Sequence, residues 1–343
     1  MADNRIRNME EFAALSGISR PTVSKYFYDP NSVRPSTRAQ IETALREYNY
    51  RPNIYAINQN RRLTKNIGIV VPYLADPFFA EMARKIERLC IGAGFRPILL
   101  SSHGDRSEEV GNLDTLRSIK PAGVLMAPLG RMSDKDAVQS FCADVPTILF
   151  DSNIDNVGAA FIGSDNDQSI GFIVDYLCRT GEPPAFFEMK TPSNPNAIKR
   201  HNAYAAAIKA HGVSPEFLQV EGQGWDFEDL GYRESMRIIE ARILPTKSIL
   251  CSNDRLAIGF LAAAHEKGLR VGNGPGYALR VAGHDDHPFS RFTCPKLTTV
   301  AQDYAAIAQT SMAQLLTSIE SGQPLEKRLT TLFSGTLIVR ESA

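Results

Sequence analysis

Acidic and aromatic residues follow several of the hydrophobic runs in this chain. Asp76, Phe78 and Phe79 stand after "IGIVV" in the segment "ADPFF", and Asp151 ends the run "PTILFD". Trp225, the only tryptophan, stands at a later expected strand end. Carboxylates accept hydroxyl protons, and aromatic side chains cover the apolar face of a sugar ring. These residue types favour a site that binds a polyol.

Each of these residues also has a purely structural interpretation. The aromatic side chains are of the kind that fill protein cores. Asp151, Asn253 and Asp254 suit helix N-caps, where Asp and Asn are favoured. Both interpretations stay open for any single residue. As a set at successive strand ends the residues favour a ligand site, because ligands bind outside the carboxyl ends of parallel strands.

Two further segments contain residue types used in catalysis. "HDDH" (284–287) has metal-ligand types, but neighbours on a strand alternate sides and cannot all face one ion. "GNGPG" (272–276) follows an expected helix and lacks the G-x-G-x-x-G spacing, so it predicts a turn. The five cysteines lie far apart and contain no CxxC pair, which predicts reduced thiols. We therefore expect no enzyme activity, no metal and no cofactor.

A second candidate site is the stretch "SGISRPTVSKYF" near the start of the chain. Ser19 suits an N-cap, and it would be followed by Arg20, Pro21 and Thr22 in the first helical turn. The first N–H groups of a helix have no intrahelical partner, so Pro21 costs no hydrogen bond there. The stretch predicts a helix that begins after Ser19.

The first residues of a recognition helix meet base edges in the major groove of DNA. Arg20 and Lys25 can donate to guanine O6 and N7, and Thr22 and Ser24 suit phosphates or bases. Pro21 offers apolar contact only. A solvated helical hairpin without a ligand remains the alternative from this pattern alone.

The elements that must position these residues fall into two parts. The first 50 residues carry helical patterns at 9–15, 19–28 and 36–50. Gly17 lies in the turn between the first two, and Ser36 is the expected cap of the third. This is the pattern of a helix-turn-helix. From residue 66 onward, Val- and Ile-rich strands alternate with helices. The expected strands are 67–72, 96–102, 122–128, 146–151, 159–163, 184–188, 248–252, 279–283 and 336–340.

Such alternation predicts parallel sheets covered by helices on both faces. About 275 residues exceed one doubly wound unit, so we expect two lobes. Charge divides the chain in the same way. Residues 1–62 hold ten Lys/Arg and six Asp/Glu, whereas the remainder holds 28 and 32. A basic head on an acidic body suggests a polyanion as partner of the head only.

The first part resembles the DNA-binding domain of the lac repressor (LacI/GalR) family of transcription regulators. The resemblance rests on "MEEFAALSGISRPTVSKYF" and "VRPSTRAQIETALREYNYRPN". It implies that Asn8 caps the first helix beside a phosphate and that Arg20, Pro21 and Lys25 occupy specificity positions. It also implies a hinge helix that docks in the minor groove. Gln59 stands where family members usually have a leucine wedge, and the implied contacts there are Asn53, Ala56, Asn58 and Gln59.

The rest of the chain resembles the periplasmic-binding-protein-like (type I) effector domain of the same family, an α/β fold of two lobes with parallel sheets. The resemblance implies effector contacts at Asn196, Arg200, Asn253, Asp285 and Gln302, beside those expected above. It also implies a DNA-binding domain at 1–52, a hinge at 53–65 and an effector domain at 66–343. The expected lobes are 66–163 with 294–325, and 164–293 with 326–343.

These expectations define a DNA-binding transcription regulator, a repressor, that binds a pseudo-palindromic operator as a dimer. A small molecule that binds in the cleft between the two lobes is expected to control its affinity for DNA, and the residue types above favour a sugar. The start lacks an apolar signal segment, which favours the cytoplasm. No leucine-heptad tail follows "LIVRESA", which favours a dimer over a tethered tetramer. The alternatives are a pure solute-binding protein and a sugar-modifying enzyme with a DNA-binding head.

Overall fold

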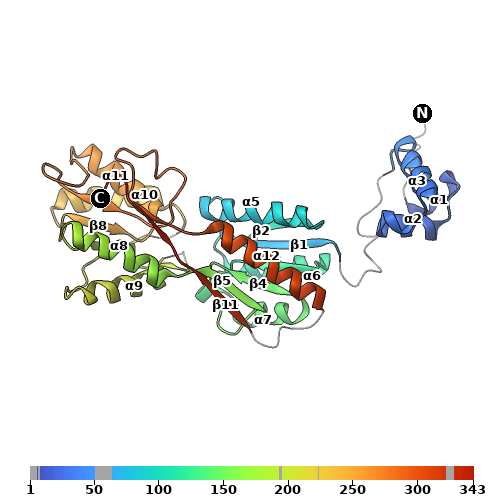
Figure 1. Ribbon diagram of the computed structural model, residues 1–343, viewed down its shortest axis with the longest axis horizontal. Coiled ribbons are helices and arrows are strands. Elements are labelled where there is room, and N and C mark those ends of the chain that lie inside the picture. The colour runs from blue at the N-terminus through green and yellow to red at the C-terminus, as the bar shows by residue number, and fades with distance from the viewer. Residues whose placement is uncertain (1–5, 7, 51–63, 193–194, 223, 322–327) are drawn as a thin grey trace. The chain divides into compact units, whose positions relative to one another are not determined.

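The chain forms two compact units, Met1–Thr64 and Lys65–Ala343. The computed structural model describes residue 6 and residues 8–50, 64–192, 195–222, 224–321 and 328–343. Each unit is coloured along the chain in Figure 1.

The described residues of the first unit, residue 6 with 8–50 and 64, form three α-helices and one short 3-10 turn. The helices are α1 (Met9–Ser16), α2 (Arg20–Tyr28) and α3 (Pro35–Glu47), with η1 (Pro30–Ser32) before α3. Gly17 ends α1 with a φ of 68°, a left-handed conformation that glycine adopts without strain. Phe12, Val23 and Ile41, one from each helix, are completely buried and form the small core with their neighbours.

The third helix begins earlier than the sequence suggested. Its first residue is Pro35 and its N-cap is Arg34, which makes no side-chain cap hydrogen bond, so Ser36 is not the cap. Proline is favoured in the first helical position because its missing N–H is not needed there. That preference outweighs the capping preference of serine at the next position.

The second unit contains two parallel sheets and a small antiparallel pair. The first sheet has the order β11-β5-β4-β3-β1-β2 and the second has the order β7-β6-β8-β9, and all of these neighbours are parallel. The strands are β1 (Asn66–Val71), β2 (Arg96–Ser101), β3 (Gly123–Met126), β4 (Thr147–Phe150), β5 (Ala160–Ser164), β6 (Ala185–Met189), β7 (Phe217–Val220), β8 (Ser248–Cys251), β9 (Arg280–Ala282), β10 (Thr299–Ala301), β11 (Leu329–Phe333) and β12 (Thr336–Ile338).

Helices cover both faces of each sheet, as the alternation predicted. They are α5 (Pro77–Gly92), α6 (Arg106–Ile119), α7 (Lys135–Asp144), α8 (Asn166–Thr180), α9 (Ala197–Ala210), α10 (Phe227–Ala241), α11 (Asp254–Glu266) and α12 (Tyr304–Ser321), with η2 (Gly130–Met132) before α7. In the first sheet, Ile67 and Ile69 face α5 and α12, whereas Val70 faces α6 and α7. In the second, Phe187 faces α10 and α11, and Phe186 faces α8 and α9.

The two sheets define two lobes, which appear side by side in Figure 1. The described chain passes between them three times: between β5 and α8, between β10 and α12, and between β11 and β12. The expected lobe boundaries were wrong at the second and third passages. Residues 294–325 were assigned to the first lobe, yet Thr298 and Ala301 form bridges with Ala282 and Asp285 of the second. Residues 326–343 were assigned to the second lobe, yet Leu329–Phe333 pair with β5 of the first sheet. The expected strands also omitted β7, β10 and β11.

Candidate functional site

The first unit presents one helix with an exposed polar face. Its N-cap, Ser19, accepts a hydrogen bond from the Thr22 N–H at 3.4 Å, and Pro21 lies in the first turn, as predicted. The side chain of Asn8 caps α1 by accepting from the Glu11 N–H at 2.8 Å. Both caps satisfy N–H groups that a helix start leaves unpaired.

Four of the predicted DNA-contacting residues of α2 are exposed: Arg20, Pro21, Ser24 and Lys25. Thr22 is half-buried, and Val23 anchors the helix in the core. Within the described part of the chain, neither Arg20 nor Lys25 forms an ion pair, so both charges face solvent. The predicted contacts Asn53, Ala56, Asn58 and Gln59 lie outside the described residues.

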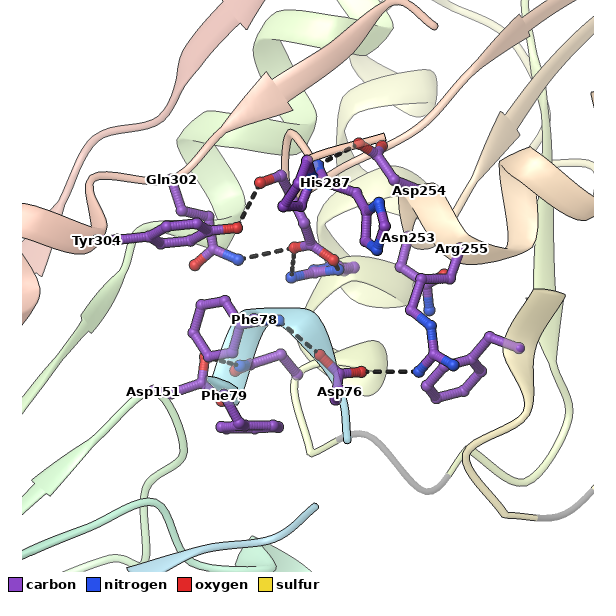
Figure 2. A pocket seen from close by; sticks show the side chains of 15 residues that line it. Asp76, Phe78, Phe79, Asp151, Asn253, Asp254, Arg255, His287, Gln302 and Tyr304 are labelled. Carbon is purple, nitrogen blue, oxygen red and sulfur yellow. Dashed lines mark hydrogen bonds and ion pairs between the residues drawn. The ribbon is translucent and has the colours of Figure 1, made fainter. Parts of the chain in front are cut away.

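The second unit contains a pocket lined by residues of both lobes. The lining consists of Asp76, Phe78, Phe79, Asp151, Asn196, Arg200, Phe227, Asn253, Asp254, Arg255, Asp285, His287, Pro288, Gln302 and Tyr304. Nine of the ten predicted effector residues are therefore brought together, and Figure 2 shows most of the lining side chains pointing inward. The free space is about 20 Å³, which is room for about one water molecule. A larger ligand must move the lobes apart or displace side chains.

Arg200 and Asp285 form the central ion pair of this pocket. The guanidinium Nη2 of Arg200 donates to Asp285 Oδ1 at 2.6 Å, and its Nη1 donates to Asp285 Oδ2 at 3.3 Å. Arg200 is only 2 % exposed and also donates to the Ser252 carbonyl at 2.8 Å. Burial by itself would raise the pKa of Asp285, but the charge and hydrogen bonds of Arg200 and the contact with His284 together outweigh it and lower this pKa to about 2.

Three further residues complete the hydrogen bonding of Asp285. The side-chain amide of Gln302 donates to Oδ1 at 2.7 Å, and the Tyr304 hydroxyl donates to the backbone carbonyl at 2.5 Å. His284 lies 3.0 Å from Oδ1 through its Nδ1. Burial lowers the pKa of His284 to about 4, so the ring is neutral at pH 7 and its Nδ1–H is the donor. Asp285 is fixed before any ligand arrives.

A second ion pair joins the two lobes. Arg255, in the first turn of α11, donates from Nη1 to Asp76 Oδ2 at 2.9 Å, and Asp76 caps α5 in the other lobe. Its Nε and Nη2 donate to the two carboxylate oxygens of Glu228 at 2.7 and 2.6 Å. Burial opposes the charge of Arg255, but the two carboxylates outweigh it and raise the pKa of the guanidinium. Arg255 therefore stays charged, whereas burial raises the pKa of Asp76 and the Arg255 charge only partly opposes this.

Asp151 is the pocket carboxylate with the weakest compensation. It is 5 % exposed and accepts one side-chain hydrogen bond, from Asn196 Nδ2 at 2.8 Å. Lys199 Nζ donates to Asn196 Oδ1 at 2.9 Å, so this ammonium acts on Asp151 through Asn196 and at a distance. Burial raises the pKa of Asp151 to about 7, and the Lys199 and Arg200 charges only partly oppose it. A ligand hydroxyl group would supply the missing donor.

Other predicted residues play two parts at once. Asn253 lines the pocket and caps α11, because its side chain accepts from the Leu256 N–H at 2.8 Å. Phe79 lines the pocket and is also packed in the core at 2 % exposure. Phe78 stands edge-on to Tyr304, with ring centroids 5.1 Å apart. The structural and ligand-binding interpretations are therefore compatible at these positions.

Trp225 is the predicted residue that the structure places elsewhere. It is absent from the pocket lining and stacks on Tyr73 of the other lobe, with centroids 5.3 Å apart and planes 14° apart. It also meets Phe79 and Phe227 edge-on at 6.0 and 5.8 Å. The sequence predicted a platform for a sugar ring at this position, whereas in this structure Tyr73 covers one face of the indole.

Several lining residues were missed by the sequence reasoning: Phe227, Arg255, His287, Pro288 and Tyr304, with Asp254 considered only as a cap. Phe227, Arg255 and Tyr304 belong to the first turns of α10, α11 and α12, and the last two stand two positions after the predicted contacts Asn253 and Gln302. Their closeness to "CSND" and "AQD" was the available signal. Within the described residues, no cluster of three or more His, Cys, Asp or Glu could hold a metal ion, and no helix is long and apolar enough to cross a membrane.

Comparison with known proteins agrees with this arrangement. Residues 8–53 match the family "Bacterial regulatory proteins, lacI family", and residues 168–343 match "Periplasmic binding protein-like domain". The "Ribose operon repressor" of Escherichia coli (strain K12) is 27 % identical over 94 % of this chain and 96 % of its own. The "HTH-type transcriptional repressor PurR" of Histophilus somni (strain 129Pt) is 27 % identical over 86 % of each.

Among solved structures, a lac repressor dimer bound to operator and the anti-inducer ONPF is 25 % identical to this chain. It superposes with a TM-score of 0.81 and covers 98 % of each chain. The periplasmic binding protein-like family matches residues 168–343, about half of the chain, and the lacI family matches the helix-turn-helix at residues 8–53. On these grounds the chain belongs to the lacI family of bacterial regulatory proteins.

Proposed function

We propose that this protein is a transcription repressor whose affinity for operator DNA is set by a small polyhydroxyl molecule, a sugar or sugar derivative, bound between the two lobes. The observation that carries the proposal is the interlobe pocket, in which nine of ten residues predicted for an effector site converge. Carboxylate and amide acceptors with aromatic faces suit hydroxyl groups on a ring.

The DNA contact is assigned to α2. Arg20 and Lys25 are exposed without ion-pair partners in the described chain, so they can meet base edges or phosphates. Pro21 narrows the direct readout because it offers no side-chain hydrogen bond. Two subunits would present two such helices to the half-sites of a pseudo-palindromic operator.

The gating is assigned to movement of one lobe relative to the other. Bonds such as Arg255–Asp76 hold the lobes together around a space too small for a sugar. An effector that binds one lobe arrangement better than the other shifts their populations, and so changes operator affinity. Linkage requires that operator changes effector affinity by the same factor.

The test uses the purified full-length protein and two steps. A thermal-shift screen of sugars, polyols and nucleosides identifies compounds that stabilise the folded protein. Operator sequences are selected from random DNA, and their affinity is measured with and without each stabilising compound. The expected result is a change of about fivefold or more for at least one compound.

Two variants separate the functions. The variant Asp285→Asn should still bind operator DNA, but the compound should no longer change its operator affinity. The double variant Arg20→Ala, Lys25→Ala should no longer bind DNA, but it should still bind the compound. The proposal is wrong if every compound that binds the pocket leaves operator affinity unchanged. Mass measurement in solution tests the dimer.

A further inference from the structure

The charges of the interlobe pocket are unequal. Four aspartates line it, namely Asp76, Asp151, Asp254 and Asp285, against two arginines, Arg200 and Arg255. Two titratable rings also line it: burial lowers the pKa of His287 and raises the pKa of Tyr304, and both shifts favour the neutral form. An anionic ligand entering this space would meet more carboxylate groups than guanidinium groups.

Both arginines are committed to the protein. Arg200 donates from all three nitrogens, to Asn166, to the Ser252 carbonyl and to Asp285. Arg255 donates from all three nitrogens to Asp76 and Glu228. A bidentate arginine–carboxylate pair is among the strongest hydrogen-bonded contacts in proteins. Of the five N–H groups of each guanidinium, these contacts use four of Arg200 and three of Arg255, so an incoming anion must compete with carboxylates already bound to either arginine.

Glu228 is the group that holds Arg255 most completely. Its helix, α10, packs so closely on α11 that only glycine fits at the crossing. A Cβ on Gly259 would lie 2.2 Å from the Glu228 carbonyl oxygen, and one on Gly231 would lie 2.5 Å from the Leu256 carbonyl oxygen. Arg255 also lies over the Phe227 ring, 5.0 Å from its centroid. The backbone geometry thus keeps the Glu228–Arg255 pair assembled.

We propose that the pocket admits uncharged polyhydroxyl effectors and rejects anionic ones, such as sugar phosphates and sugar acids, and that Glu228 enforces this choice by occupying Arg255. This inference deepens the proposed function and rests on it. An anion in the pocket must displace a carboxylate from an arginine or remain next to unpaired carboxylates. In a site of reduced dielectric constant, either cost weakens binding by a factor on the order of a hundred.

The experiment measures anion binding by the full-length protein at constant ionic strength. The probes are inorganic phosphate and D-ribose 5-phosphate, and the readouts are thermal shift and titration calorimetry. The variant is Glu228→Gln, which keeps the shape of the side chain and removes its charge. Its matched control is Glu234→Gln on the same helix, because Glu234 pairs with Arg237 at 3.0 Å and does not line the pocket.

The wild type and Glu234→Gln should bind neither probe in the pocket, whereas Glu228→Gln should gain affinity for both by at least about tenfold. The double variant Glu228→Gln, Arg255→Gln should lose that gain, which assigns it to the freed guanidinium. Phosphate held by the DNA-binding unit is common to all variants and cancels. Denaturation curves verify that each variant is folded.

Two outcomes would overturn the inference. One is binding of either probe by the wild type that disappears in Arg255→Gln, and the other is a Glu228→Gln variant without any gain. Neither readout involves DNA. If anions bind the wild-type pocket while polyols change operator affinity, the inference fails and the proposed function stands. If Glu228→Gln gains anion binding but no compound changes operator affinity, the proposed function fails instead.

Discussion

The indole of Trp225 lies flat against the phenol ring of Tyr73, and the two rings belong to different lobes. Their centroids are 5.3 Å apart and their planes differ by 14°. Trp225 is 6 % exposed, and its Nε1 has no hydrogen-bond partner among the residues that the structure describes. Gly104 of the first lobe passes under this nitrogen, where a Cβ would lie 2.6 Å away. The contact therefore exists only while the lobes are close together.

Trp225 should report lobe opening by fluorescence, since it is the only tryptophan in the chain. Tyr73→Ala removes an aromatic pair worth about 0.5–1.5 kcal/mol beyond its buried area, so it should shift Trp225 emission to the red. Tyr277→Ala, a distant and partly exposed position, should leave the spectrum unchanged. An unshifted spectrum in Tyr73→Ala would mean that the indole stays buried without its partner.

Arg200→Met should destabilise the protein strongly. The substitution leaves Asp285 without its cation, and removing one partner of a buried ion pair costs about 3–5 kcal/mol. Urea denaturation at pH 7 measures the loss. Arg233→Met, which breaks an exposed pair with Asp229, is the control and should change the free energy of unfolding little. A small loss in Arg200→Met would show that the Gln302 and His284 contacts hold Asp285 on their own.

Effector affinity should rise between about pH 6 and 8 with a midpoint near 7, because burial raises the pKa of Asp151 to about 7 and only its ionised form has a full set of acceptors. Asp151→Asn should flatten this profile.

The raised pKa of Asp151 affects folding stability in the opposite direction. The folded state binds the proton more tightly than the unfolded state, so the contribution of Asp151 to stability is present below pH 4 and is lost as the pH rises through 7.

Both profiles of Asp151 can be measured on one preparation, by calorimetry of ligand binding and by urea denaturation at a series of pH values. Asp254, whose pKa burial also raises to about 7, is unchanged in Asp151→Asn and supplies the background. If the binding profile of Asp151→Asn keeps its midpoint near pH 7, Asp254 rather than Asp151 is the titrating group.

Arg20→Ala should relax base preference at one position of each operator half-site, at a cost of about 1–3 kcal/mol if the contact is bidentate to guanine. Pro21→Ala should alter the preference little, because proline donates no side-chain hydrogen bond. Selection of operators from random DNA by each variant measures both effects. A strong base preference that disappears with Pro21 would reverse this assignment.

Much of the site was accessible from the sequence because one rule places it. Strands of a parallel sheet end at one edge, so Asp76 and Asp151 could be expected to converge before any coordinates were known. The contacts Arg200, Asn253, Asp285 and Gln302 required the family resemblance, because nothing in their local pattern distinguishes a ligand contact from a helix cap or a solvated side chain.

Long-range packing explains the errors. Trp225 stands at the expected place in the chain, but its partner Tyr73 is 152 positions away, and no local pattern announces that stack. Arg255 was overlooked because a helix start is normally solvated, whereas the opposite lobe covers this one. The predicted lobe boundary was wrong at β11, which pairs with β5 of the first sheet. The local sequence of β11 is compatible with an edge position in either sheet, so it does not indicate which sheet the strand joins.

The three passages of the chain between the lobes have a consequence for how such proteins diversify. A lobe is not a continuous segment, so a single recombination event cannot exchange one for that of a relative. A chimaera that takes its second lobe from another protein needs junctions between β5 and α8, between β10 and α12, and between β11 and β12. New effector preferences in this architecture should therefore arise by point substitution around the pocket more readily than by shuffling.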